Sequence, residues 1–175
     1  MTTNTPAFDM YDGTVPGILQ TLKGLSVVLA KAETHCTERN ISKDVVLAYR
    51  LAPDMFPLVR QVQIVTDQAK GMAARLSGRE LPSYPDTETT FEELQARIAK
   101  VTGFINSIDR SEIDGSHAKQ IHLKLGAREM TFSGAAYAFQ FVLPNFYFHA
   151  ATAYDILRHA GVVLTKADFL GATEA

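Results

Sequence analysis

The sequence predicts an all-α protein: a four-helix bundle with a small β-hairpin between the third and fourth helices. Three observations support this fold. Apolar residues recur at steps of three and four in three separate segments, which is the spacing of one buried helix face. A fourth segment, 131–154, contains no charged residue and should be covered from several sides. Just before it, apolar and polar residues alternate on both sides of Gly126-Ala127, as in a hairpin.

The first predicted helix spans Thr14–His35. Thr14 offers an N-cap hydroxyl, and Pro16 is tolerated in the first turn of a helix. Residues 1–12 are expected to form a short arm or an early helical turn. The face that should point into the core is a stripe of apolar residues: Ile18, Leu22, Leu25, Leu29 and Ala32.

The second predicted helix spans Met55–Leu76 and follows a short connecting helix at Ser42–Leu51. Asp54 can cap it, Pro57 falls in its first turn, and Gly78 is a typical C-terminal stop. The apolar stripe of this helix has the same spacing as the first: Leu58, Val62, Val65, Ala69, Met72 and Leu76.

The third predicted helix spans Phe91–Ile108. It begins at a capping box, in which the side chains of Thr90 and Glu93 bond to backbone donors at the helix start. The preceding residues, 79–89, contain two prolines and are predicted to form a loop. The third stripe consists of Phe91, Leu94, Ile98, Val101, Ile105 and Ile108.

The fourth predicted helix, Gly134–Ala160, is apolar nearly all round, and Pro144 is expected to kink or divide it. Its length also suits a membrane span. We favour a buried helix of a soluble bundle, because hydrocarbon would leave the polar groups of Gln140, Asn145 and His149 poorly served. The bundle itself can cover one face of this helix. The other face needs a second partner, and because a second copy of the chain is the simplest, we predict a homodimer.

Length and composition indicate one globular domain, residues 1–175, with a tail at 162–175 that docks on the bundle. The formal net charge is −2 and no run of basic residues occurs, so neither nucleic acid nor a membrane is an expected partner. The single cysteine, Cys36, excludes an internal disulfide and fits a reducing compartment. Residues 1–9 do not resemble a signal peptide, and we predict a cytoplasmic protein.

Two pairs of side chains outside the fourth helix have a chemical interpretation as well as a structural one. His35 and Cys36 could form a thiol–imidazole pair, but an ordinary helix end is favoured because no orienting group is nearby. His117 and His122 could hold a metal if their loop folds back. Their spacing is not a helical ligand spacing, so surface histidines are favoured.

Several segments together resemble an uncharacterised family, a domain-of-unknown-function family of the DinB/YfiT-like helical-bundle superfamily. They are APDMFPL at 52–58, QVQ at 61–63, PNFYFH at 144–149, YDILRHAG at 154–161 and DFLG at 168–171. The resemblance covers nearly the whole chain. It implies a DinB/YfiT-like four-helix bundle that often binds a divalent metal through three histidines. It also implies that some members are metal-dependent thiol transferases or hydrolases.

By this resemblance, His149 stands at one of the three ligand positions, and Asn145 and Gln61 stand where the other two histidines would be. Amide oxygens are weak ligands for zinc or nickel. We therefore expect no metal and no other cofactor, with a divalent metal as the less favoured alternative. His149 should be mostly buried and hydrogen-bonded to Asn145 or to a glutamine, since buried polar groups need partners.

The functional expectation is an uncharacterised, dimeric, cytoplasmic bundle that binds a small molecule in a pocket between its helices. The predicted ligand-binding residues are Gln61, Asn145, His149 and Thr152. One alternative is a metal-dependent transferase or hydrolase with an altered metal site, and another is a purely structural or interaction module. Whether the chain is an enzyme stays open, because no catalytic triad, phosphate loop or paired-carboxylate site stands out.

Overall fold

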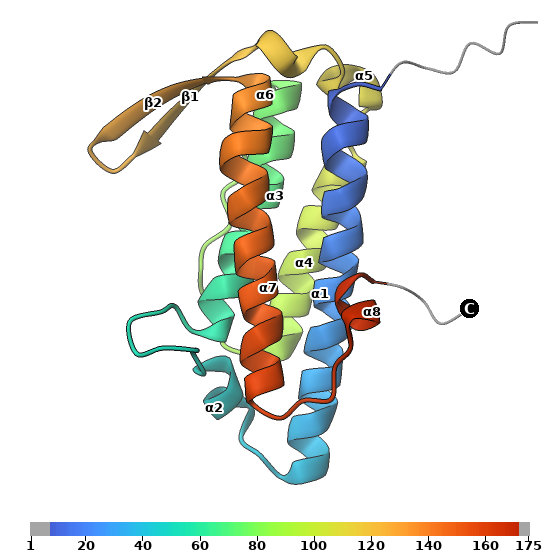
Figure 1. The fold of residues 1–175 in the computed structure, drawn as a ribbon, viewed down its shortest axis with the longest axis vertical. Helices are drawn as coiled ribbons and strands as arrows, with labels where there is room; N and C mark the ends of the chain where they lie inside the picture. Colours follow the sequence, from blue (N-terminus) through green and yellow to red (C-terminus); the bar gives the residue numbers. More distant parts are fainter. Residues whose placement is uncertain (1–7, 172–175) are drawn as a thin grey trace, which may run out of the picture.

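A bundle of four long helical segments forms the body of the computed structural model, which describes residues 8–171 apart from the side chain of Leu125 (Figure 1). Residues 1–7 of the expected arm and 172–175 of the expected tail lie outside the described residues. The long helices are α1 (Met10–Arg39), α3 (Leu58–Ser77), α4 (Phe91–Asn106) and α7 (Leu143–His159). The shorter elements are α2 (Lys43–Leu47), α5 (Arg110–Ile113), η1 (Ser116–Ala118), β1 (Gln120–Leu125), β2 (Arg128–Ser133), α6 (Gly134–Ala136), η2 (Tyr137–Val142) and α8 (Lys166–Phe169).

All residues of the three predicted apolar stripes are buried in one core, so the periodicity placed the inward faces correctly. Helix α1 is long and apolar enough to cross a membrane by length and composition, but half of its most apolar window is buried inside the bundle. A core helix of a bundle has the same properties. The segment that was weighed as a membrane span forms α6, η2 and α7, and α7 packs against α3.

The first helix is longer than predicted at both ends. It begins at Met10 rather than Thr14, because Asp9 and Asp12 form a capping box there. Thr14 is no N-cap: it is buried within the helix, and its hydroxyl donates to the carbonyl of Met10 at 2.6 Å. The helix ends at Arg39 instead of His35, where Asn40 turns into the left-handed conformation with φ 54°.

The second long helix begins at Leu58 rather than Met55, and Asp54 does not cap it. Pro57 is the N-cap residue, with an extended backbone, and a proline holds the residue before it extended as well. The connecting helix, predicted at Ser42–Leu51, is the shorter α2, Lys43–Leu47. At the other end, Gly78 adopts φ 83° and stops the helix, as predicted. The capping box of Thr90 and Glu93 at the start of α4 is also confirmed.

The fourth helix consists of three consecutive pieces, α6, η2 and α7, with η2 in the wider π-helical form. Pro144 lies in the first turn of α7, directly after η2. Proline has no N–H to donate and its ring excludes the carbonyl one turn before it. A π-helical turn is one way in which a helix absorbs such a defect. The change from π to α geometry here is the division that Pro144 predicted.

The predicted hairpin is present, with Ile121 opposite Phe132 in an antiparallel pair joined at Gly126-Ala127. Figure 1 shows it projecting sideways from the end of the bundle near α6. A two-stranded hairpin is marginal alone. This one is anchored by Phe132, whose ring centroid lies 6.4 Å from that of Tyr137 and 5.5 Å from that of Phe141. The hairpin therefore packs on η2.

Replacing Gly24 by alanine is expected to destabilise the protein, because the new Cβ would lie 2.0 Å from the backbone oxygen of Phe169. The α8 segment would have to move off α1, and overpacking of this kind costs about 1–3 kcal/mol. Denaturant unfolding measures the loss. The matched control is Gly103→Ala in α4, where the added methyl meets no atom within 4 Å and should add about 0.5–1 kcal/mol. Equal stabilisation by both substitutions would contradict this account of α8.

Candidate functional site

Gln61 and His149 form a polar pair between α3 and α7. Gln61 is 1% exposed, and its Nε2 donates to the backbone carbonyl of Phe56 at 3.0 Å. Its Oε1 therefore faces the imidazole of His149 and lies 2.6 Å from Nδ1. An amide oxygen can only accept, so Nδ1 carries the proton. The Nε2 atom of His149 then keeps its lone pair as an acceptor.

His149 is only half-buried, which corrects the expectation of a mostly buried side chain. It lies at the edge of the face that α7 turns toward α3, next to Phe148, which is 58% exposed. The rings of Phe148 and His149 meet edge to face, with centroids 5.1 Å apart. The predicted glutamine partner is found, and it is Gln61.

The electrostatic surroundings keep the imidazole uncharged. Partial burial lowers the pKa of His149, and the nearby charge of Arg60 lowers it further. At neutral pH the ring is therefore the neutral tautomer, with one donor spent on Gln61 and one acceptor remaining. A neutral imidazole of this kind can accept a hydrogen bond or a proton.

Asn145 and Thr152 lie on α7 one turn before and one turn after His149, but each bonds to its own helix. The Asn145 amide donates to the carbonyl of Phe141 at 2.7 Å, and the Thr152 hydroxyl donates to the carbonyl of Phe148 at 2.7 Å. The structure thus brings Gln61 and His149 together and leaves the other two beside them. None of the five cavities described for residues 8–171 is lined by these four residues.

The donor set does not fit a three-histidine metal site. The Oε1 atom of Gln61 already accepts from His149. Arg60 adds positive charge next to the imidazole, which disfavours a cation. Within residues 8–171, no group of three or more His, Cys, Asp and Glu side chains is placed to hold a metal ion. Zinc normally takes at least three protein ligands.

The other pairs that the sequence offered do not form reactive sites. Cys36 is 1% exposed in the core, and burial raises the pKa of its thiol, which disfavours the nucleophilic thiolate. His117 and His122 are both exposed, and the Nδ1 atom of His122 lies 2.9 Å from the hydroxyl of Thr131. The favoured structural interpretation of these residues fits their surroundings.

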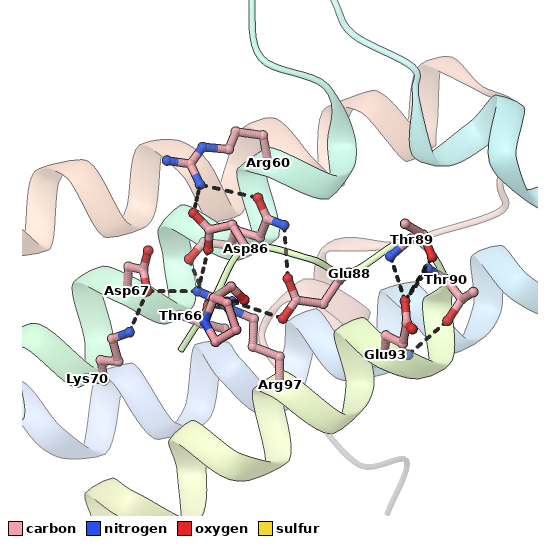
Figure 2. Close-up of polar contacts among 12 residues, drawn as sticks. Arg60, Thr66, Asp67, Lys70, Asp86, Glu88, Thr89, Thr90, Glu93 and Arg97 are labelled. Atoms are coloured by element: carbon pink, nitrogen blue, oxygen red, sulfur yellow. Dashed lines mark hydrogen bonds and ion pairs between the residues drawn. The ribbon is translucent and has the colours of Figure 1, made fainter. Parts of the chain in front are cut away.

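Sequence reasoning missed an ionic cluster centred on Arg97 (Figure 2). This α4 guanidinium is nearly buried, its side chain being 2% exposed. It pairs with Asp67 of α3 at 2.8 Å and with Asp86 and Glu88 of the connecting segment at 2.9 Å each. The available signal was its position, because Arg97 lies between Leu94 and Ile98 of the third stripe. A charged residue there needs several buried partners.

The architecture is that of a DinB-like helical bundle, with a buried glutamine of α3 paired to a half-buried histidine of α7. Over residues 10–170 the chain matches the family described as "Domain of unknown function (DUF1993)". It belongs to this family. A crystal structure of a DinB family member from Shewanella denitrificans is 38% identical, with 94% of this chain and 93% of that chain covered and a TM-score of 0.83. No match was found among the curated proteins.

The lowered pKa of His149 predicts a pH effect on stability. The unfolded chain binds a proton at this residue near pH 6.5, whereas the folded chain binds it only at lower pH. Stability should therefore fall as the pH drops below 6.5, until the folded pKa is passed. Unfolding free energies of the protein and of His149→Gln, compared between pH 7.5 and 5.5, measure this. Identical pH slopes for the two proteins would contradict the prediction.

Proposed function

We propose that this protein is a cytoplasmic, dimeric member of the DUF1993 family that binds a small molecule at Gln61 and His149. The observation that carries the proposal is the neutral imidazole of His149, which a buried amide holds with one nitrogen left to accept. Residues fixed by a second polar contact in this way are pre-organised for binding. Asn145 and Thr152 flank the imidazole on the same helix and complete the proposed site.

The chemistry of the pair selects the ligand. An acceptor nitrogen calls for a hydroxyl or an N–H on the ligand, and the charge of Arg60 opposes an ammonium group. Two exposed aromatic residues offer apolar surface next to the pair. The ring of Phe148 contacts that of His149, and Phe56 is the residue whose carbonyl accepts from Gln61. The proposed ligand is a small neutral molecule with one donor group next to an aromatic or aliphatic part. A metal-dependent transferase or hydrolase ranks second, because the donor set does not fit the metal.

A ligand-observed NMR screen with neutral phenols, alcohols and amides tests the site. The protein should bind a subset of these probes, and both His149→Phe and Gln61→Leu should weaken that binding. His159→Phe, at an exposed position in the last turn of α7, is the matched control and should bind as the parent does. Equal binding by the parent and His149→Phe would contradict the proposed site.

The dimer is supported by an uncharged, partly apolar outer face formed by α1, η2 and α7. Phe139 and Tyr147 are 42% and 41% exposed, and the segment to which they belong, 131–154, contains no charged residue. Their rings lie over two glycines of α1: Gly13 is close to Phe139, and Gly17 is close to the Tyr147 hydroxyl. Exposed apolar patches of this kind mark contact sites, and a C2 dimer would bury the same patch on both copies.

Sedimentation velocity at micromolar concentration is expected to show a dimer. Tyr147→Glu places a charge in the proposed interface and should shift the protein to monomer, because an unpaired charge is costly to bury. Val45→Glu adds the same charge at a residue of α2 that is 53% exposed and should leave the dimer intact. A parent protein that sediments as a monomer would contradict this part of the proposal.

A further inference from the structure

A pocket separate from the Gln61–His149 pair lies where α3, the connecting segment 78–90, β1 and η2 meet. Its volume is about 380 Å³, which is within the usual range for small-molecule sites. Tyr84 of the connecting segment, Leu123 of β1, and Tyr137 and Phe141 of η2 form its walls, together with Arg75 of α3. None of the residues of the Gln61–His149 pair contributes to it.

The segment that forms one wall has no helix or strand, but it is held in place by the ionic cluster. Arg97 bonds the carbonyl of Pro85 at 3.0 Å in addition to Asp86 and Glu88, and the amide of Gln63 donates to Glu88 at 2.9 Å (Figure 2). Arg60 pairs with Asp86 as well. The pocket is therefore pre-formed, since its loop is fixed to both α3 and α4.

Three charged side chains line the pocket, Asp67, Lys70 and Arg75, and of these only Arg75 has no ion pair within residues 8–171. In the ionic cluster, the cations Arg60, Lys70 and Arg97 are matched by the carboxylates of Asp67, Asp86 and Glu88. Arg75 is not part of this cluster of ion pairs. Its Nη1 bonds the Gly71 carbonyl at 3.2 Å and the Tyr137 hydroxyl at 3.0 Å, and it makes no ion pair within residues 8–171. Its remaining N–H groups are available to a ligand.

Tyr137 adds a second donor beside that guanidinium. Arginine can only donate, so the phenol oxygen accepts from Arg75, and the phenol proton is left for another acceptor. Burial raises the pKa of Tyr137, against the opposing charge of Arg75, so the proton stays on the phenol. The ring stacks on that of Phe141, with centroids 6.2 Å apart and planes 20° apart. Both rings belong to η2, and π-helical turns of this kind are frequent at functional sites.

We propose that this pocket binds a small monocarboxylate with an aromatic ring, with Arg75 and the Tyr137 hydroxyl on the carboxylate and the ring against Tyr137, Phe141 and Leu123. A planar guanidinium binds a carboxylate through two parallel hydrogen bonds. The charged residues that line the pocket are Asp67, Lys70 and Arg75, whose formal charges sum to +1, so a single negative charge on the ligand is matched better than the double charge of phosphate. This site goes beyond the proposed function at His149 and is independent of it.

Isothermal titration with phenylacetate tests the proposal, with phenylacetamide as the uncharged counterpart. The parent protein should bind phenylacetate with a dissociation constant of about 1 mM or tighter. The parent should bind phenylacetamide about tenfold or more weakly than phenylacetate, because the charged hydrogen bonds are lost. Arg75→Gln should weaken the binding of phenylacetate by a similar factor for the same reason. Arg75→Lys keeps the positive charge but loses the two parallel N–H donors of the guanidinium, and it should weaken binding less than Arg75→Gln does. Tyr137→Phe keeps the stacked ring and should cost a few-fold.

Two controls separate this site from general effects. Arg39→Gln removes an exposed arginine in the last turn of α1 and should bind phenylacetate as the parent does. His149→Phe should also leave this binding unchanged, so failure of the proposed function does not affect the result. Circular dichroism checks that each variant is folded. Absence of phenylacetate binding by the parent, equal binding of phenylacetamide, or undiminished binding by Arg75→Gln would each overturn the proposal.

Discussion

Replacing Arg97 by methionine is expected to lower the free energy of unfolding by about 3–5 kcal/mol, the cost of removing one partner from a buried ionic group. Burial opposes the charge of Arg97, but the hydrogen bond to Glu88 and the neighbouring carboxylates outweigh it and raise the arginine pKa. Without the guanidinium, Asp67, Asp86 and Glu88 repel one another. The connecting segment would then lose its anchor on α4.

Urea unfolding monitored by circular dichroism measures this loss. Arg79→Met is the matched control, because Arg79 pairs with Glu112 at 2.6 Å on a surface where their side chains are 36% and 30% exposed. Exposed ion pairs contribute little, so this variant should unfold almost as the parent does. A similar, small loss for both arginines would show that the Arg97 cluster does not anchor the segment.

Replacing Leu25 by alanine is expected to cost about 2–5 kcal/mol, because the side chain is deleted from the centre of the packed core. Leu25 is 2% exposed and belongs to the first apolar stripe. Thermal or urea unfolding gives the value. Val163→Ala, at a position that is 77% exposed, should change stability by no more than about 0.5 kcal/mol. A loss near zero for Leu25→Ala would mean that the stripe does not face inward.

The fold could be predicted because its information is local and repeated. Each stripe requires only that apolar residues recur every three or four positions, and an error at one position does not move the face. The ends of helices are less certain because competing caps lie close together. Thr14 followed by Pro16 was read as a helix start, whereas Asp9 and Asp12 supply a reciprocal pair of caps earlier in the chain. Spacing alone does not rank such alternatives.

The partners of the polar side chains could not all be predicted from the sequence, because they depend on how the helices pack. The sequence placed Gln61 and His149 in one proposed site, and the structure joins them by a hydrogen bond. The sequence could not show that Asn145 and Thr152 would bond to the backbone of their own helix, since a polar side chain is satisfied equally well by its own helix or by a partner across the bundle. Arg75 and Tyr137 are 62 positions apart, and they meet only because η2 packs on α3. No short motif connects such residues.

Long-range proton–nitrogen NMR of the His149 side chain most directly tests the central claim that Gln61 holds a neutral imidazole with a free acceptor. At pH 7 the account predicts a proton on Nδ1, a bare Nε2, and a pKa below the ordinary 6.5. Gln61→Leu should remove the preference between the two nitrogens, whereas Gln63→Leu, two positions along α3, should not. A proton on Nε2 in the parent protein, or a charged ring at pH 7, would contradict the account.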